Sequence, residues 1–295
     1  MQERRAPILE HKAYAAPSVF QVDNLLREAR RQRAMPEGAI PAVCVLDPDG
    51  DLAQHLIATG QAALHAHWAC YHTQLYAFTC AGIECGVVPY AVGGSFAVLV
   101  AEELFASGCR LLISITSAGQ IVPAGQPPYF VLIERALRDE GTSYHYRPPA
   151  AYSVIRPALA GRLQNAFTGA AIRVLRGASW TTDAPFRETA EAIEFARAEG
   201  IAGVEMEAAA LYAFAEAQGN DVVCFAHITN QMAVAEGDFE KGLDGGSHDA
   251  LQVIGLTVRG FMNGSNLGPP AGGACVENEA NEANEDDRKG VTSRS

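Results

Sequence analysis

The sequence is poor in basic residues: 22 lysines and arginines stand against 34 aspartates and glutamates, which gives a formal net charge of −12. Residues 277–287 alone carry six acids and no base. Such a surface repels a phosphate backbone, so we expect no nucleic-acid partner. Apolar runs of the roughly 20 residues that span a membrane are also missing, and no secretory signal follows residues 1–5. We therefore expect no membrane partner and a cytoplasmic location.

Cysteine motifs are missing as well. No pair of the seven cysteines has Cys-x-x-Cys spacing, and Cys44 and Cys224 lie inside apolar runs. This pattern is typical of buried, reduced thiols. His65, His67 and His72 form the only local histidine cluster, without further ligands nearby, so the sequence predicts no metal site.

Composition and length favour one large folded domain, because 48% of the 295 residues are hydrophobic. Residues 1–38 form a polar extension in which residues 24–33 have helical spacing, and we expect it to pack on the body or on a neighbouring subunit. Residues 39–263 form the domain. Residues 264–295 are an acidic tail that we predict to be disordered, because it contains almost no large apolar side chains.

Strand and helix signals alternate through this domain, which indicates an α/β fold whose central sheet is covered on both faces. The sequence predicts strands at residues 42–46, 75–79, 83–91, 111–116, 129–134, 172–177 and 222–228. It predicts helices at residues 51–58, 96–107, 151–167, 188–199, 206–218 and 248–262.

The most informative segment is Glu205-Met206-Glu207, at the start of the helix predicted for residues 206–218. An amphipathic helix entering a core would carry alanine or leucine there, and an unpaired buried carboxylate is costly. The vicinal hydroxyls of a ribose would satisfy these carboxylates, with Met206 against the sugar ring. The alternative is an exposed first turn whose acids favour the helix dipole.

Other polar residues follow predicted strands, where ligands bind in open α/β sheets. Ser117 has small residues after it, so backbone N–H groups and the Ser117 hydroxyl can approach an anion or a sugar. Gly93 opens the helix near residue 96 and leaves backbone N–H groups accessible. Trp180 can stack on a nucleobase, or it can be an ordinary core aromatic.

Four segments together resemble the nucleoside phosphorylase and nucleosidase family, which includes hexameric purine nucleoside phosphorylase, uridine phosphorylase and methylthioadenosine nucleosidase. They are residues 117–119 (SAG), 138–146 (RDEGTSYHY), 180–189 (WTTDAPFRET) and 203–210 (GVEMEAAA). The resemblance spans about residues 40–262. It implies a three-layer α/β sandwich with a mixed, partly barrel-like central sheet flanked by helices. It also implies a homo-oligomer, either a dimer or a trimer of dimers, that cleaves nucleosides without a cofactor.

The resemblance assigns roles to individual residues. Glu207 would receive the ribose 2′- and 3′-hydroxyls, with Met206 under the sugar and Glu205 beside it. Trp180 would stack on the base. Ser117 would contact phosphate or the attacking water, while the base would lie near a further position, residue 230, where purine-cleaving members have an acidic aspartate.

The sequence differs from the phosphorylases at the residues that bind phosphate, the acceptor of the glycosyl group. Their phosphate-binding arginines are replaced by Ser114, by Gln54 or a neighbour, and by residues near Tyr71 or His72. Phosphate would lose charge-assisted hydrogen bonds as a result. The nucleosidases use water and an acid from the first strand-loop. Asp49 and Asp51 match that acid by spacing, although residues 47–51 also fit a tight turn and helix cap.

The residue at position 230 bears on the leaving group. Asn230 can donate a hydrogen bond but cannot protonate adenine, so a 6-oxopurine or a pyrimidine is favoured, with Gln231 beside Asn230. The sequence therefore predicts cleavage of a nucleoside N-glycosidic bond, with phosphate or water as the acceptor. The alternative is a catalytically silent nucleoside-binding protein with the same fold.

Overall fold

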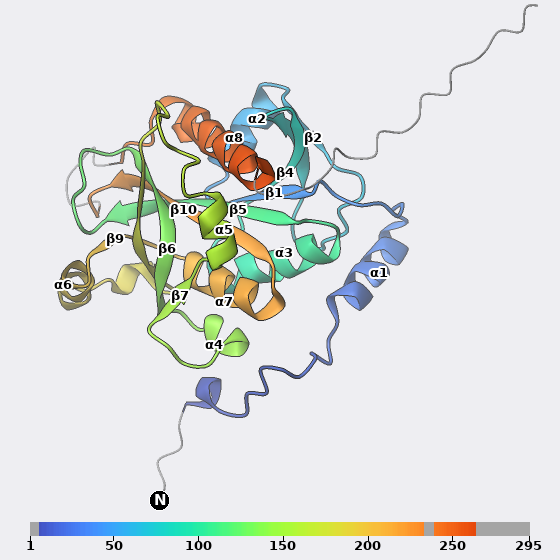
Figure 1. Ribbon diagram of the computed structural model, residues 1–295. Helices are drawn as coiled ribbons and strands as arrows, with labels where there is room; N and C mark the ends of the chain where they lie inside the picture. Colours follow the sequence, from blue (N-terminus) through green and yellow to red (C-terminus); the bar gives the residue numbers. More distant parts are fainter. Residues whose placement is uncertain (1–5, 233–238, 264–295) are drawn as a thin grey trace, which may run out of the picture. The chain divides into compact units, whose positions relative to one another are not determined.

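The computed structural model describes residues 6–232 and 239–263. Within them, one mixed sheet contains ten strands (Figure 1). The strands are β1 (Val43–Asp47), β2 (Ala62–Leu64), β3 (Tyr76–Cys80), β4 (Ile83–Pro89), β5 (Leu111–Gln120), β6 (Tyr129–Asp139), β7 (Tyr152–Val154), β8 (Val174–Thr182), β9 (Ile201–Glu205) and β10 (Asp221–Asn230).

Half of this sheet closes into a barrel. The strands run in the order β10–β6–β8–β9–β5, and β10 also pairs with β5, which completes the ring. The other half is open and continues from β5 through β1, β4 and β3 to β2. β1, β5 and β10 are parallel, whereas β9 is antiparallel to β5 and β10 is antiparallel to β6. The predicted mixed, partly barrel-like sheet is therefore confirmed.

Helices cover both faces of the sheet. They are α1 (Val22–Arg33), α2 (Asp51–Ala58), α3 (Gly94–Ala106), α4 (Ser143–Tyr146), α5 (Pro157–Arg162), α6 (Ala190–Ala198), α7 (Ala208–Gln218) and α8 (Ser247–Asn263). Three short 3-10 helices, η1 (Pro7–Leu9), η2 (Pro185–Arg187) and η3 (Leu243–Gly246), lie in the connections. α3 packs against α7 on one side of the sheet, and α2 packs against α8 on the other (Figure 1).

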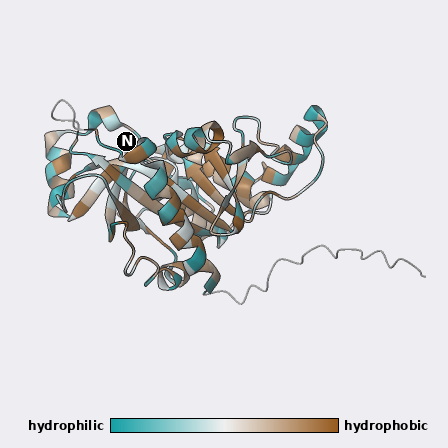
Figure 2. Cartoon of the chain, turned by 90° about the horizontal axis from the view of Figure 1, so that it is seen from above, coloured by the Kyte–Doolittle hydropathy of each residue, from teal (hydrophilic) through white to brown (hydrophobic). Residues whose placement is uncertain are grey.

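The sequence explains why the layers form. All five residues of β1 are buried, as expected for a strand covered on both faces. α7 begins with three alanines, is buried along most of its length and ends at Gly219 in the left-handed conformation, a common helix stop. In Figure 2 the apolar colour concentrates on the strands and on the helices packed against them.

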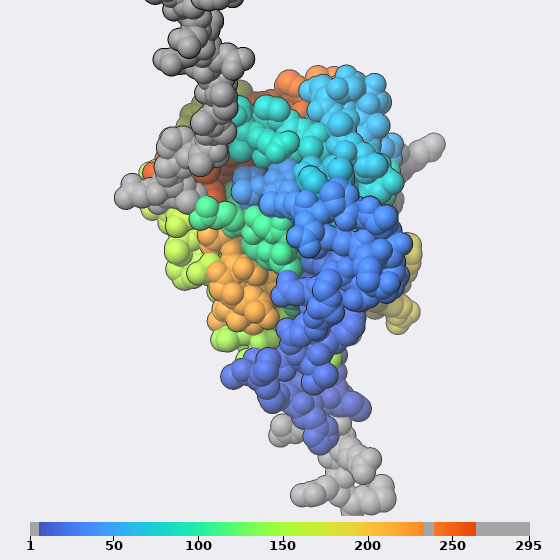
Figure 3. All heavy atoms as spheres, turned by 90° about the vertical axis from the view of Figure 1, so that its right-hand side faces the viewer, coloured from blue at the N-terminus to red at the C-terminus, as the bar shows by residue number. Residues whose placement is uncertain are grey.

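The N-terminal segment packs on the body of the same chain. Leu26 and Ala29 of α1 are buried against Ala69, and the Arg33 guanidinium donates to the Cys70 carbonyl at 2.7 Å. Figure 3 shows this segment, in blue, crossing one face of the molecule. The predicted helix at residues 24–33 is confirmed, with its start at Val22. The predicted tail, residues 264–295, lies outside the described residues.

Some predicted boundaries were wrong. The helix expected at residues 151–167 is instead the strand β7 followed by the short helix α5, because Pro157 fits only the first turn of a helix. β2 was not predicted, and neither was β9, whose Ala202 and Gly203 interrupt the apolar run. Its Gly203 permits close packing: a Cβ there would lie 2.9 Å from the Gly119 carbonyl oxygen. Residues 206–207 therefore precede α7, which starts at Ala208.

Two further features bear on the expectations from composition. Six cysteines of the described residues are free and buried, in agreement with the predicted buried thiols. No helix in the described part of the chain is long and apolar enough to cross a membrane.

The pairing of β10 with β5 is irregular between Ile228 and Asn230, where the register shifts.

Candidate active site

Polar side chains meet where β1, β5, β9 and β10 end. Ser117 of β5 pairs in register with His227 of the parallel strand β10, and Gly119 pairs with Val204, next to Glu205. β1 pairs with β5 on the other side and ends at Asp47. This convergence brings together most of the residues that the sequence singled out.

Glu205 is a buried carboxylate whose oxygens are fully engaged. Its Oε1 accepts hydrogen bonds from the hydroxyls of Ser179 (2.9 Å) and Thr181 (2.5 Å). Its Oε2 accepts from the backbone N–H groups of Glu207 and Ala208, both at 2.7 Å. Burial raises the pKa of Glu205 above its usual value, and these donors oppose the rise. Glu205 thus caps α7 and leaves no oxygen for a ligand.

Glu207 lies two residues further on and is only half engaged. Its Oε1 accepts the Gly93 backbone N–H at 2.7 Å, while its Oε2 is buried without a hydrogen-bond partner in the described part of the chain. The residue is 1% exposed. Burial first, and then the negative charge of Glu205, raise the pKa of Glu207 to about 8, against the effect of the Gly93 N–H and the nearby Thr116 hydroxyl. An unpaired buried carboxylate oxygen needs a donor, such as a ligand hydroxyl.

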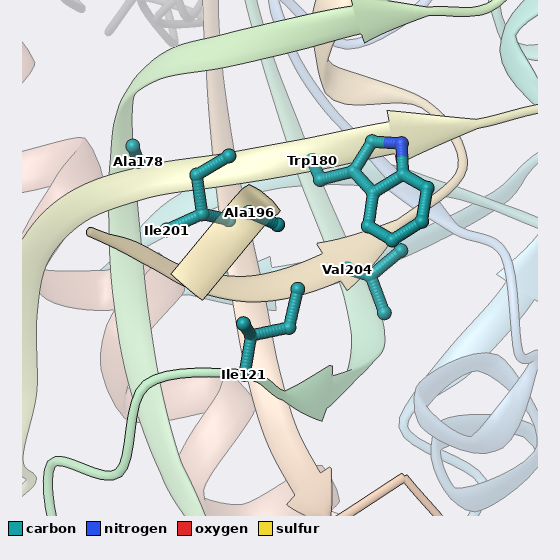
Figure 4. Packing of buried hydrophobic residues seen from close by; sticks show 6 residues of the cluster. All are labelled: Ile121, Ala178, Trp180, Ala196, Ile201 and Val204. Atoms are coloured by element: carbon teal, nitrogen blue, oxygen red, sulfur yellow. The ribbon is translucent and has the colours of Figure 1, made fainter. Parts of the chain in front are cut away.

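Trp180 lies on β8 and is 4% exposed. Figure 4 shows its indole beside Val204, within a cluster of buried apolar side chains. Its Nε1–H donates to Asp139 at 3.0 Å. The partly buried Met232 also packs against this cluster. This arrangement fits the core interpretation of Trp180, and its stacking on a base stays a prediction.

Residues at the end of β10 are placed close to the barrel. Asn230 is buried, and its Oδ1 accepts the Met232 backbone N–H at 2.9 Å. Its side-chain amide donates to the Thr229 hydroxyl at 3.2 Å. Gln231 follows on the surface, and Met206 is partly buried between the two glutamates. The amide of Asn230 is therefore held by local bonds at the end of the strand.

The turn after β1 carries three aspartates with different surroundings. Asp47 is buried and accepts the backbone N–H groups of Gly50 (3.2 Å) and Ala53 (2.9 Å), so it caps α2. Burial raises the pKa of Asp47 to about 7. Asp49 accepts the Ser117 backbone N–H at 3.0 Å through Oδ2. Asp51 begins α2.

Lys241, which the sequence analysis did not identify as a site residue, offsets part of the negative charge of this turn. The Lys241 ammonium forms ion pairs with Asp49, at 3.7 Å, and with Asp51 at shorter range. Burial alone would lower the pKa of Lys241, but the two aspartates raise it above its usual value. The ammonium and the Ser117 N–H meet the same Asp49 oxygen. Lys241 thus pairs with both Asp49 and Asp51, and the assignment of either aspartate as the general base stays a prediction.

A small cavity of about 20 Å³ lies among these groups. All three aspartates of the turn line it, together with Thr116, Ser117 and His227. His227 is 6% exposed, and its Nε2 has no hydrogen-bond partner within residues 6–232 and 239–263. Burial lowers the pKa of His227 to about 4, so the imidazole is neutral near pH 7.

Sequence reasoning missed His227, Lys241 and Thr116. His227 carries a weak signal, since a histidine inside an otherwise apolar strand is unusual. Lys241 gave no signal, because it is about 190 residues from Asp51 in the chain and only the fold joins them. Thr116 ends an apolar run, as many strand residues do.

Comparisons with known proteins agree with this architecture. The family model described as the phosphorylase superfamily matches residues 44–254, and the chain belongs to that superfamily. Uridine phosphorylase from Vibrio fischeri is similar in structure, with a TM-score of 0.60, 16% sequence identity, and coverage of 79% of this chain and 96% of that one. Purine nucleoside phosphorylase from Toxoplasma gondii has a TM-score of 0.63 and 14% identity over 76% of this chain and 91% of that one. No curated protein sequence matches significantly.

Proposed function

We propose that the protein is an enzyme that cleaves the N-glycosidic bond of a nucleoside. The observation that carries this proposal is the buried Oε2 of Glu207. This oxygen has no hydrogen-bond partner among the described residues, whereas both oxygens of the neighbouring Glu205 accept hydrogen bonds. A ribose hydroxyl donates to such an oxygen and removes the cost of its burial. Membership of the phosphorylase superfamily supports the same reaction class.

Asn230 is the residue we assign to the base. Its side chain is held at the end of β10 by Thr229 and Met232, so it meets a ligand in a defined orientation. An amide stabilises a leaving base whose negative charge spreads onto oxygen, which favours a 6-oxopurine or a pyrimidine. In this proposal Met206 lies under the sugar, while Trp180 and Gln231 flank the base.

The reaction needs an acceptor for the glycosyl group, phosphate or water, and no other cofactor. Ser117 and the turn that holds Asp49 and Asp51 form the acceptor side, and Gly93 supports Glu207 on the sugar side. As in the family it resembles, we propose that the protein acts as a homo-oligomer, a dimer or a trimer of dimers. Sedimentation of the pure protein tests the oligomeric state.

Incubation of the protein with a panel of nucleosides tests the reaction. Chromatography should detect free base from a 6-oxopurine or a pyrimidine nucleoside. Glu207→Gln keeps an acceptor for the Gly93 N–H but replaces the second oxygen, which would accept the ribose hydroxyl, with an amide NH₂ group. It should lower kcat/KM by about 10- to 100-fold, the cost of leaving a buried polar group without its partner.

A matched control is Glu199→Gln, because this glutamate is exposed and its carboxylate accepts the Tyr152 hydroxyl at 2.8 Å. It should leave kcat/KM unchanged. Nucleoside binding without release of base, in the wild-type protein, would favour the catalytically silent binding protein instead.

A further inference from the structure

We propose that Met232 controls the entry of the base: in the free protein its thioether lies in the place that the base must take, and a nucleoside has to displace it. The inference rests on the proposed function, since it takes the base to bind beside Asn230. Two observations carry it. One is what surrounds the Met232 sulfur, and the other is the backbone conformation of Met232.

The Met232 sulfur fills a space beside the backbone of Gly119. This glycine of β5 pairs with Val204 of β9 and with Asn230 of β10, so the three residues lie side by side across the sheet. A Cβ on the glycine would lie 2.6 Å from Met232 Sδ, 3.3 Å from Asn230 Oδ1 and 3.5 Å from Val204 Cγ1. Glycine in a strand often marks a place where a ligand comes close to the backbone. Here a side chain of the same chain makes that approach.

The Met232 side chain also covers the apolar surface that would face the base. Val204 pairs with Trp180 of β8, and Figure 4 shows the indole beside Val204. Met232 is partly buried against the cluster that contains both residues. A thioether and a flat base compete for such a surface, because both pack well on aromatic and apolar groups. Met232 thus takes up contacts that the proposed function gives to the base.

The contact between Met232 and Gly119 is too close to admit a base ring. Non-bonded carbon atoms prefer a separation of about 3.5–4.0 Å, and the sulfur lies 2.6 Å from the place of a Cβ. Even a methyl group at this place would therefore require the sulfur to move. A base that approaches the Gly119 backbone beside Asn230 meets the thioether first.

The backbone of Met232 holds the side chain in this place. Its φ of +66° lies in the left-handed region, which residues with a side chain rarely adopt. Its N–H donates to Asn230 Oδ1 at 2.9 Å, which closes a turn after β10. This turn brings the Met232 side chain back to Gly119 of the neighbouring strand. Unfavourable backbone conformations of this kind cluster at ligand-binding sites.

Displacement of the thioether needs little rearrangement. Methionine is unbranched and has three rotatable side-chain bonds, so the sulfur can leave by rotation of the side chain alone. The hydrogen bond between the Met232 N–H and Asn230 can stay in place during this rotation. The amide therefore keeps its orientation for the base. Binding loses the contacts of the thioether and gains those of the base.

The alternative is a fixed Met232 that forms the floor of the base site. The two roles predict opposite effects of shortening the side chain. A competing occupant lowers the apparent affinity by the fraction of time for which the site is free, so its removal strengthens binding. A floor contributes apolar contacts to the base, so its removal weakens binding.

Binding of free bases distinguishes the two roles. Calorimetry with uracil, a pyrimidine, and with hypoxanthine, a 6-oxopurine, measures Kd without turnover. Met232→Ala should bind the preferred base about 10-fold more tightly than the wild type, as expected if the thioether occupies the site about nine-tenths of the time. Met232→Leu keeps the bulk of the side chain and should stay close to the wild type. In turnover, Met232→Ala should lower KM by the same factor and leave kcat little changed.

A matched control is Met35→Ala. Met35 is another methionine packed at the edge of a buried cluster, but its cluster consists of Leu26, Ala29 and Ala69. The control should change neither Kd nor KM. Weaker or unchanged base binding by Met232→Ala would overturn the inference, as would the absence of base binding by every variant.

NMR follows the displacement directly in the wild-type protein. The chain has five methionines, so their carbon-13 methyl groups give few signals, and Met232→Leu identifies that of Met232. Saturating base should move this signal toward the shift of a solvent-exposed methionine. A Met232 signal that the base leaves unchanged would overturn the inference. Displacement by the base without any cleaved nucleoside would uphold the inference and overturn the proposed function instead.

Discussion

The β1–α2 turn and the β9–α7 turn use the same arrangement of two acids separated by one residue. In each, the first acid ends the strand and caps the following helix: Asp47 accepts two N–H groups at α2, and Glu205 accepts two at α7. The second acid accepts one N–H from another part of the fold. Asp49 receives that of Ser117, and Glu207 that of Gly93.

The two turns differ in what surrounds the second acid. Asp49 has a side chain 33% exposed with Lys241 beside it, whereas Glu207 is buried, with Glu205 as its charged neighbour. The Asp49 carboxylate is thus paired with a cation and reached by solvent, whereas one oxygen of Glu207 is buried with no partner among the described residues. The same local pattern therefore gives two carboxylates with different surroundings.

The capping acids give the largest expected difference between the turns. Glu205→Ala leaves two hydroxyls and two N–H groups buried without their acceptor, so it should lower the free energy of unfolding by about 4 kcal/mol. Asp47→Ala removes a two-bond cap and should cost about 2 kcal/mol. Urea unfolding of both variants measures this. Equal losses would mean that the side-chain hydroxyls of Ser179 and Thr181 contribute nothing.

The pH dependence of stability separates the second acids. The pKa of Glu207 is raised from 4.5 to about 8 in the folded protein, so folding favours its protonated form. Its contribution is fully present below pH 4.5 and is lost as pH rises through 8. Glu207→Gln should therefore flatten the decline in stability between these pH values, as followed by urea unfolding. A slope in Glu207→Gln as steep as that of the wild type would contradict this assignment.

The ion pairs of Lys241 give the smallest expected effect on stability. The ammonium is 32% exposed and the paired carboxylates about as much, so solvent screens the attraction. Lys241→Met should change the free energy of unfolding by less than about 1 kcal/mol. A loss of several kcal/mol in thermal or urea unfolding would show that the β1 turn is held as rigidly as the β9 turn.

Local signals in the sequence were enough for the α/β class and for the burial of Glu207, whose role stays a prediction. The apolar strands, the alternation of strand and helix and the unusual acids before an alanine-rich helix were all visible within short windows. The different hydrogen bonding of Glu205 and Glu207 was not visible in the sequence. Their partners Ser179, Thr181 and Gly93 come from distant parts of the chain. The pairing of Lys241 with Asp51 and the burial of the Trp180 indole likewise depend on tertiary packing.

The irregular pairing of β10 has a consequence for how this site can change. Ile228 and Asn230 would face the same way in a regular strand, and Ile228 is fully buried. The shift in register between them turns Asn230 independently of its apolar neighbour. Residues beyond this point can therefore be exchanged without repacking the interior of the barrel, and under the proposed function such exchanges would change the preference for the base.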